Sequence, residues 1–132
     1  MDASVGFAWV YEDQATSETD HLLHELAAGA VAVVPAMWFL EVANVLLTAQ
    51  RRNRLTQAQR KTALEKLGAM QFIVDDDAAR SAFGKTSDLA EKYGLTVYDA
   101  HYLEVALRRK LPLASRDEAL RQAAKRCGVK VF

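Results

Sequence analysis

The 132-residue sequence has a single cysteine, only two prolines and no long hydrophobic segment. One cysteine, Cys127, excludes an internal disulfide framework and is typical of a protein in a reducing compartment. The longest apolar run, residues 27–40, is too short to span a bilayer and is interrupted by Gly29 and Pro35. The first residues lack the basic and apolar leader of a signal peptide. These absences predict a cytoplasmic protein without a membrane segment.

Basic residues are absent from the first 50 positions, which contain seven Asp and Glu. The rest of the chain therefore holds all 17 Lys and Arg against ten acids, a net charge of +7, although the whole chain is neutral. Such asymmetry is a hint of a polyanionic partner such as nucleic acid. The alternative is that charged helix faces balance one another in three dimensions. Charge alone leaves both interpretations open.

Short apolar segments alternate with helical patterns along the whole chain. Strands are predicted at residues 31–34, 72–74, 111–114 and 129–131. Helices are predicted at 5–11 (ended by Glu12 and Asp13), 16–29, 36–52, 56–68 (begun by a capping box of Thr56 and Gln59), 78–83 with a second piece ending at 93, from 99 onward, and 115–127. This alternation predicts an α/β fold, a parallel sheet covered by helices on both faces, in a single domain of residues 1–132.

Asp99 stands out on its predicted helix. On a helical wheel from Asp99 onward, Tyr102 and other apolar residues face one side, whereas His101, Glu104 and Arg108 face the other. Asp99 lies in the middle of the apolar side, where an unpaired charge would be costly. Asp99 is therefore either the N-cap of the helix or part of a site, and we expect His101 to be solvated.

Glu41 lies on a helix whose faces are almost all apolar. The exception is a narrow stripe of Glu41, Asn44 and Thr48. A helix with this pattern is buried on most sides and lines a site along its polar stripe. Glu41 is surrounded in sequence by large apolar residues, so solvation alone does not explain it.

Four carboxylates lie near predicted strand ends or in the helices that follow them: Asp2, Glu41, Asp99 and Asp117. In an open α/β sheet the ligand crevice lies outside the carboxyl ends of the strands, so the four can converge there. Converging carboxylates repel one another unless a cation neutralises them. Oxygen ligands without His or Cys favour Mg²⁺ or Mn²⁺ over zinc. A site of this kind suits phosphodiester hydrolysis.

Each carboxylate also has a purely structural interpretation. Asp2 can belong to a frayed terminus, and Asp117 can be a first-turn acid inside a capping box of Ser115 and Glu118. Asp75 and the two acids after it are interpreted as caps and first-turn acids of the helix that follows. The four acids favour a metal site only when they are taken as a set.

Four short motifs, in this order and spacing, resemble the PIN-domain family, and most closely the VapC-type toxins of bacterial toxin–antitoxin pairs. The motifs are Asp2-Ala-Ser4 followed by Trp9, Glu41-Val-Ala-Asn44-Val-Leu46, Tyr98-Asp99-Ala100-x-Tyr102-Leu103, and Ala114-Ser115-Arg116-Asp117. Together they extend the resemblance from Asp2 to Val131, nearly the whole chain.

The resemblance implies a PIN-like three-layer sandwich with a parallel sheet of about five strands flanked by helices. It also implies an endoribonuclease that depends on Mg²⁺ or Mn²⁺, forms a homodimer and is held inactive by a cognate antitoxin. The catalytic metal site would consist of Asp2, Glu41, Asp99 and Asp117, with Ser4, Asn44 and Ser115 in support.

Related proteins carry a few apolar residues before the first Asp, whereas only Met1 precedes Asp2 here. We therefore expect a severely shortened first strand, or a true start that lies upstream. The candidates for binding RNA phosphates are Arg51, Arg52, Arg54 and Arg116. Two alternatives stay open: a receiver-like Mg²⁺-binding signalling domain with Asp75 as its phosphoacceptor, and a catalytically defective PIN-like binding module.

Overall fold

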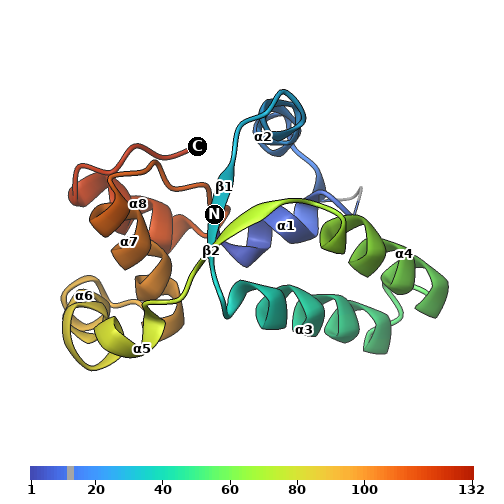
Figure 1. The fold of residues 1–132 in the computed structure, drawn as a ribbon. Helices are drawn as coiled ribbons and strands as arrows, with labels where there is room; N and C mark the ends of the chain where they lie inside the picture. Colours follow the sequence, from blue (N-terminus) through green and yellow to red (C-terminus); the bar gives the residue numbers. More distant parts are fainter. Residues whose placement is uncertain (12–13) are drawn as a thin grey trace.

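The computed structural model describes residues 1–11 and 14–132 and places two parallel strands between two groups of helices. In chain order the elements are α1 (Ala3–Ala8), α2 (Ser17–Ala27), β1 (Ala32–Pro35), α3 (Trp38–Arg51), α4 (Gln57–Gly68), β2 (Phe72–Asp75), α5 (Ala78–Ser81), the π-helix η2 (Ala82–Thr86), α6 (Ser87–Tyr93), α7 (Val97–Arg109) and α8 (Glu118–Arg126). Figure 1 shows α1, α3 and α4 on one side of the strands and α5 to α8 on the other. Within the described residues, no helix has the length and apolar character needed to cross a membrane.

Strands β1 and β2 pair in parallel, from Ala32 opposite Phe72 to Pro35 opposite Asp75. Most of their residues are Val, Ile or Phe, which fit a pleated sheet surface. Helices α3 and α4 connect the two strands, as a parallel pair requires. The prediction of an α/β fold with a parallel sheet flanked by helices is therefore confirmed.

Two residues take the place of a full strand at the centre of the sheet. The backbone nitrogen of Met1 donates to the Val33 carbonyl of β1 at 3.1 Å. On the other side, the Asp2 nitrogen donates to the Ala114 carbonyl at 2.9 Å. Met1 and Asp2 thus connect β1 to the segment at 111–114, and these two bonds join the two halves of the molecule.

The predicted strands at 111–114 and 129–131 contribute one isolated parallel bridge, Leu113 to Val131. The Leu113 nitrogen donates to Lys130 at 2.8 Å, and the Phe132 nitrogen donates to Leu113 at 3.0 Å. The expected number of about five strands is therefore wrong for the described residues, where β1 and β2 form a two-stranded sheet. The reason is that a two-residue centre offers the segment at 111–114 one backbone partner instead of a ladder.

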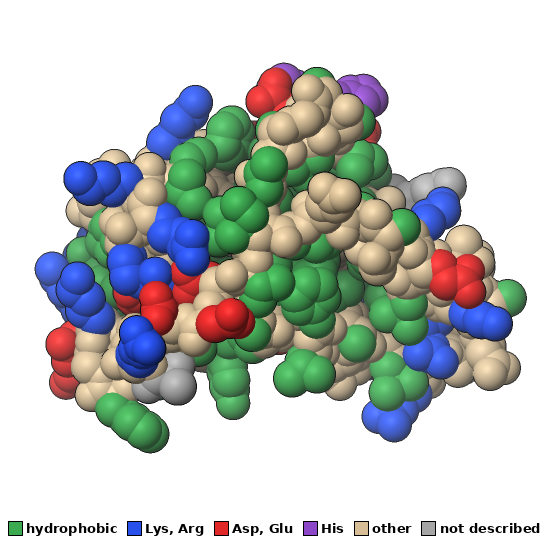
Figure 2. Space-filling model, viewed as in Figure 1, with side chains coloured by type: hydrophobic (Ala, Val, Ile, Leu, Met, Phe, Trp, Pro, Cys, Tyr) green, Lys and Arg blue, Asp and Glu red, His purple; other side chains and the backbone are tan. Residues whose placement is uncertain are grey.

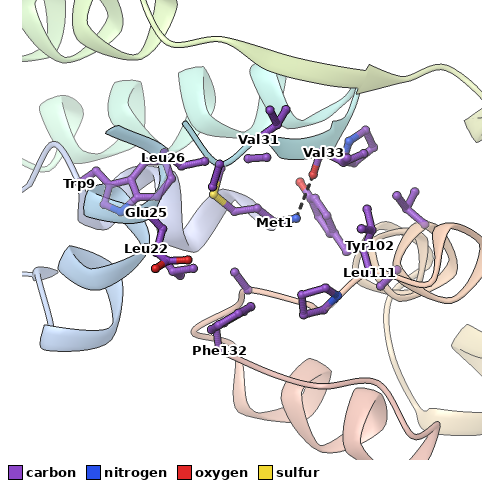
Figure 3. A pocket seen from close by; sticks show the side chains of 17 residues that line it. Met1, Trp9, Leu22, Glu25, Leu26, Val31, Val33, Tyr102, Leu111 and Phe132 are labelled. Carbon is purple, nitrogen blue, oxygen red and sulfur yellow. Dashed lines mark hydrogen bonds between the residues drawn. The ribbon is translucent and has the colours of Figure 1, made fainter. Parts of the chain in front are cut away.

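An apolar cavity of about 230 Å³ lies beside the central residues (Figure 3). Its walls include Val31 and Val33 from the β1 side and Leu111 from the opposite side. The Met1 ammonium group is desolvated there, and this burial lowers its pKa from 8.0 to about 6, against the opposing effect of the Asp2 carboxylate.

Trp38, the first residue of α3, anchors the core beside the central residues. Its ring centroid lies 4.8 Å from that of Phe72, and its indole nitrogen donates to the Asp2 carbonyl at 3.1 Å. A Cβ atom on Gly6 would lie 2.5 Å from the Trp38 ring, so the glycine is what lets α1 pack directly against this ring. These contacts fix the backbone of Asp2 next to α3.

Side-chain caps set the helix boundaries. The capping box predicted at Thr56 and Gln59 is present at the start of α4. The first predicted helix begins earlier than residue 5, because Asp2 is its N-cap. The predicted end of that helix, at Glu12 and Asp13, lies outside the described residues.

Helix α7 is buried on two faces. His101 and Glu104 are only 3% and 2% exposed, so the prediction that this side of the helix faces solvent is wrong. The helix is covered on that side by the segment from α5 to α6, which lies against it in Figure 1. Burial lowers the pKa of His101, although the nearby Glu104 and Asp75 carboxylates oppose this shift.

Asp75, at the end of β2, is the centre of a buried ion-pair network. Arg108 Nη2 lies 2.7 Å from Asp75 Oδ1 and its Nε lies 2.9 Å from Glu104 Oε1, while Arg109 Nε also donates to Asp75. Burial alone would raise the pKa of Asp75, but the two arginines outweigh it and lower the pKa to about 2. The interpretation of Asp75 as a helix cap or first-turn acid is therefore wrong, because this side chain binds β2 to α7.

Candidate active site

Three of the four predicted carboxylates come together at the carboxyl edge of the sheet. Asp2 is the N-cap of α1. Glu41 lies in the first turn of α3, which follows β1, and Asp99 lies in the first turn of α7. Both Asp99 and Asp2 are close enough to Glu41 for their negative charges to shift its pKa. The sequence pattern therefore located three acids that share one electrostatic environment.

Asp2 is almost fully buried and held by two serines. Its Oδ1 accepts from the Ser4 nitrogen at 2.9 Å and from the Ser4 hydroxyl, while its Oδ2 accepts from the Ser115 hydroxyl. Burial raises the pKa of Asp2, and the hydrogen bonds from Ser115 and Ser4 and the charge of the Met1 ammonium only partly oppose this. The interpretation of Asp2 as a frayed terminus is wrong, because both carboxylate oxygens have fixed partners.

Glu41 is held by a residue that the sequence argument placed in the core. The Tyr102 hydroxyl donates a hydrogen bond to Glu41 Oε2, from α7 to α3. Burial raises the pKa of Glu41, and the charges of Asp99 and Asp2 raise it further, against the effect of the Tyr102 hydrogen bond. Burial and the neighbouring carboxylates likewise raise the pKa of Tyr102. Tyr102 thus orients the Glu41 side chain, while burial and the neighbouring carboxylates disfavour its negative charge.

Asp99 is held by Thr96. The Thr96 hydroxyl accepts from the Asp99 nitrogen at 3.0 Å and donates to Asp99 Oδ2 at 2.6 Å. Thr96 is the N-cap of α7, so the interpretation of Asp99 as the N-cap is wrong. The second Asp99 oxygen has no role in capping and is available to the crevice.

Asp117 lies at the start of the helix that follows the segment at 111–114. Its side chain is exposed, is the N-cap of α8 and accepts from the Leu120 nitrogen at 2.8 Å. The predicted capping box of Ser115 and Glu118 is therefore wrong. The Asp117 nitrogen donates to the Ser115 hydroxyl at 3.0 Å, and that hydroxyl donates to Asp2. Asp117 is linked to the three acids through Ser115 and the backbone rather than by its carboxylate.

The predicted supporting and basic residues are distributed around the three acids. Asn44 lies one turn after Glu41 on α3, and Arg51 ends that helix. Arg52 and Arg54 follow it and are exposed. Arg116 is partly buried: its nitrogen donates to Ser4 Oγ at 2.9 Å and its guanidinium donates to Gln14 at 3.1 Å. Arg116 therefore already has protein partners.

The donor chemistry of the three acids fits a hard divalent cation. Carboxylate oxygens are ligands that Mg²⁺ and Mn²⁺ prefer, and the raised pKa of Glu41 beside two like charges is the condition that a cation relieves. In the present arrangement, no three His, Cys, Asp or Glu side chains of the described residues are placed to hold a metal ion together. Hydroxyl groups hold one oxygen of Glu41, one oxygen of Asp99 and both oxygens of Asp2, so a bound cation would share these carboxylates with their hydroxyl donors.

The receiver-like alternative does not fit the structure. It requires Asp75 to accept a phosphoryl group, and this side chain is fully buried between Arg108 and Arg109. A phosphodonor has no access to it, and the arginines hold both carboxylate oxygens.

Sequence reasoning missed the roles of Tyr102 and Thr96. Thr96 is the N-cap of α7, three positions before Asp99, and Tyr102 lies on the same helix, three positions after it. Side chains with this spacing are neighbours on a helix. This spacing could have indicated that Thr96 and Tyr102 lie near the candidate site. The Tyr102 face of the helix is mostly apolar, so Tyr102 was interpreted as a core residue.

These features define an α/β protein with three carboxylates that act on one another beside a parallel sheet. A family model described as PIN domain matches residues 1–126. The chain therefore belongs to the PIN domain family, whose members are typically metal-dependent nucleases. A comparison with curated proteins gave no match.

Proposed function

We propose that this chain is an endoribonuclease that depends on Mg²⁺ or Mn²⁺ and works as a single domain of residues 1–132. The observation that carries the proposal is Glu41, whose pKa is raised by burial and by Asp99 and Asp2. No Lys or Arg of the described residues contributes to that shift. A partly buried group of like charges, in which the Met1 ammonium group acts on Asp2 but no Lys or Arg acts on Glu41, suits an exogenous cation.

In this proposal Asp2, Glu41 and Asp99 hold the cation. When bound, a divalent cation supplies Lewis acidity for water and for a phosphoryl oxygen. The hydroxyls of Ser115, Tyr102 and Thr96 fix the three carboxylates before the cation arrives. Asp117 completes the predicted metal site through its link to Ser115.

We further propose the biological role of a VapC-type toxin, cytoplasmic and homodimeric, whose cognate antitoxin covers the three acids. The support is the order and spacing of the four sequence motifs. Expression of the chain alone in a bacterial host should arrest growth, and co-expression of its cognate antitoxin should restore growth. Normal growth with active, soluble protein present would contradict the toxin role.

The metal-dependent reaction is tested with the variant Asp99→Asn, a single-stranded RNA substrate and Mn²⁺ or EDTA. Wild-type cleavage should require Mn²⁺ or Mg²⁺ and stop in EDTA. Asp99→Asn should lose most cleavage and most of the rise in melting temperature that Mn²⁺ causes. Its metal-free stability should be unchanged or higher, because one repelling charge is removed.

Two control variants separate chemistry from folding. Asp88→Asn removes an exposed first-turn acid of α6 and should leave cleavage unchanged. Thr56→Ala removes the cap of α4, away from the three acids, and should cost about 1 kcal/mol of stability, with metal binding retained. A stable Asp99→Asn protein that cleaves at the wild-type rate would refute the proposed site. Wild-type protein that binds RNA without cleaving it under any metal condition would instead be a binding module.

A further inference from the structure

A groove lies between α1 and α3, one helical turn beyond Glu41. This hollow of about 340 Å³ is lined by Phe7 from α1 and by Asn44, Thr48 and Arg52 from α3 and its C-cap. Both helices begin at the acids, since Asp2 caps α1 and Glu41 lies in the first turn of α3. The groove therefore lies along the two helices whose first turns carry two of the candidate site residues.

One face of α3 forms the floor of this path. Glu41, Asn44, Thr48 and Arg52 are spaced by three or four residues, so their side chains follow one another along the same face. The axial distance from Glu41 to Arg52 is about 16 Å at the rise of an α-helix. About five stacked nucleotides cover that length at 3.4 Å each.

The far end of the groove is cationic. Arg54 lines both this hollow and a second one of about 510 Å³, which Lys66 of α4 also lines. Within residues 1–11 and 14–132, Arg52, Arg54 and Lys66 form no ion pair, whereas Arg108 and Arg109 are paired with buried acids. Figure 2 shows Lys and Arg side chains gathered over the end of α3 and the start of α4. These positive charges are available to an external anion.

An aromatic ring lines the groove between its two ends. Phe7 is half-buried, and its ring centroid lies 5.2 Å from that of Tyr11 at an interplanar angle of 33°. A partly exposed ring supported from behind by a second ring is a platform on which a base can stack.

We propose that this groove is the binding track for single-stranded RNA. Arg52 and Arg54 bind phosphates, Asn44 and Thr48 offer hydrogen-bonding groups, and Phe7 stacks against one base. Base stacking on a protein ring requires unpaired bases, which excludes a regular duplex from the track. The inference rests on the proposed nuclease function and adds to it the strand form of the substrate and the residues that bind it.

An acidic protein segment would also be attracted by the cationic end. Two observations favour RNA: the ring of Phe7 in the wall, and Asn44 in the lining, one helical turn from Glu41 and its neighbouring acids. Competition between RNA and an acidic peptide distinguishes the two occupants.

The first test compares two exposed basic residues, one inside the groove and one outside it. Arg52 and Lys85 of η2 are both exposed and both lack an ion pair within the described residues, but only Arg52 lines the groove. Binding of a fluorescently labelled single-stranded RNA is measured by anisotropy in EDTA at several salt concentrations. Arg52→Ala should weaken binding about tenfold at low salt and reduce the slope of log affinity against log salt by about 0.7. Lys85→Ala should leave the slope unchanged, and equal effects of the two variants would refute the track.

The second test concerns the ring. Phe7→Leu keeps an apolar side chain for packing and should weaken binding of single-stranded RNA about tenfold, with no effect on the weak binding of duplex RNA. Phe83→Leu is the matched control, because Phe83 is fully exposed on η2 and lies outside the groove. Thermal melting checks that both proteins are folded. If Phe7→Leu then binds RNA as tightly as wild type, Phe7 does not stack against a base. If poly-glutamate displaces the labelled RNA as effectively as unlabelled RNA does, the groove is a site for an acidic protein.

The outcomes of these tests are independent of the cleavage assay. Loss of RNA binding in Arg52→Ala without any metal-dependent cleavage in wild type would keep the track and refute the nuclease. Metal-dependent cleavage with unchanged binding in Arg52→Ala and Phe7→Leu would keep the nuclease and refute the track.

Discussion

Tyr102 donates a hydrogen bond to Glu41 across a separation of 61 residues, and so joins α7 to α3 at the three acids. The donor comes from the half of the molecule that contains Asp99, and the acceptor comes from the half that contains the proposed RNA track. This one bond therefore couples the position of two carboxylates.

Tyr102→Phe should leave Glu41 without its hydroxyl donor while the ring keeps its place in the core. We expect a loss of about 1 kcal/mol in the free energy of unfolding and a further rise in the pKa of Glu41. The measurements are urea unfolding and thermal melting with and without Mn²⁺. Tyr98→Phe is the control, since Tyr98 is exposed. A Tyr102→Phe protein as stable as Tyr98→Phe would show that the bond contributes nothing.

Gly6→Ala should damage the site through packing. The added Cβ would meet the Trp38 ring at 2.5 Å, so α1 must move away from this ring and carry Asp2 with it. We expect a loss of about 1–3 kcal/mol in stability and weaker metal binding. Gly68→Ala, at a helical glycine with nothing within 4 Å of the new atom, should be neutral or mildly stabilising. Urea unfolding of both variants makes the comparison, and similar midpoints would contradict it.

Acid should unfold the protein partly through Asp75. Its pKa is lowered to about 2 in the folded protein, so its contribution to stability is complete above its ordinary pKa of 3.8 and is lost as the pH falls toward 2. Asp75→Asn should cost about 3–5 kcal/mol near neutral pH, because Arg108 and Arg109 lose their buried partner. Asp76→Asn, at the exposed neighbour, should be nearly silent. Parallel pH dependence of wild type and Asp75→Asn between pH 4 and 2 would argue against this role.

The Met1 ammonium group should make stability depend on pH near neutrality. Its pKa is lowered to about 6 in the folded protein, so between pH 6 and 8 the unfolded chain binds more protons and stability rises with pH. The rise amounts to about 2 kcal/mol at most. Buried His101 shifts stability in the same direction, so the comparison is between unmodified protein and protein acetylated at the Met1 nitrogen. Acetylation should make the urea midpoint depend less on pH between pH 6 and 8. Identical pH dependence of the two proteins would contradict the role of the Met1 ammonium group.

The sequence contained enough to place Asp2, Glu41 and Asp99 in one crevice. Glu41 interrupts an apolar helix face and Asp99 lies on another, and acids near the carboxyl ends of parallel strands converge by topology. The local spacing that makes Thr96 a cap and Tyr102 a neighbour of Asp99 was also present. This spacing alone did not identify Thr96 as the cap, because several polar residues near the start of a helix can serve as its cap.

Other features depend on contacts that no local pattern encodes. Periodicity identified that His101, Glu104 and Arg108 share a face, but the partner that covers the face is Asp75 of β2 with the segment after it. Likewise Leu40, on the apolar helix expected to be buried on most sides, is 75% exposed. What lies opposite a helix face is decided by tertiary packing, which the period of 3.6 residues does not describe.

Two of the bonds that hold Asp2 in place come from the far end of the chain. Its carboxylate is bound by Ser115, 113 residues later, and its nitrogen by Ala114. During synthesis on the ribosome, at about 5–20 residues per second, roughly 6–20 seconds pass between the emergence of Asp2 and of these partners. Nascent chains thus carry the acids without an assembled crevice, and any activity of the three carboxylates begins only with a nearly completed molecule.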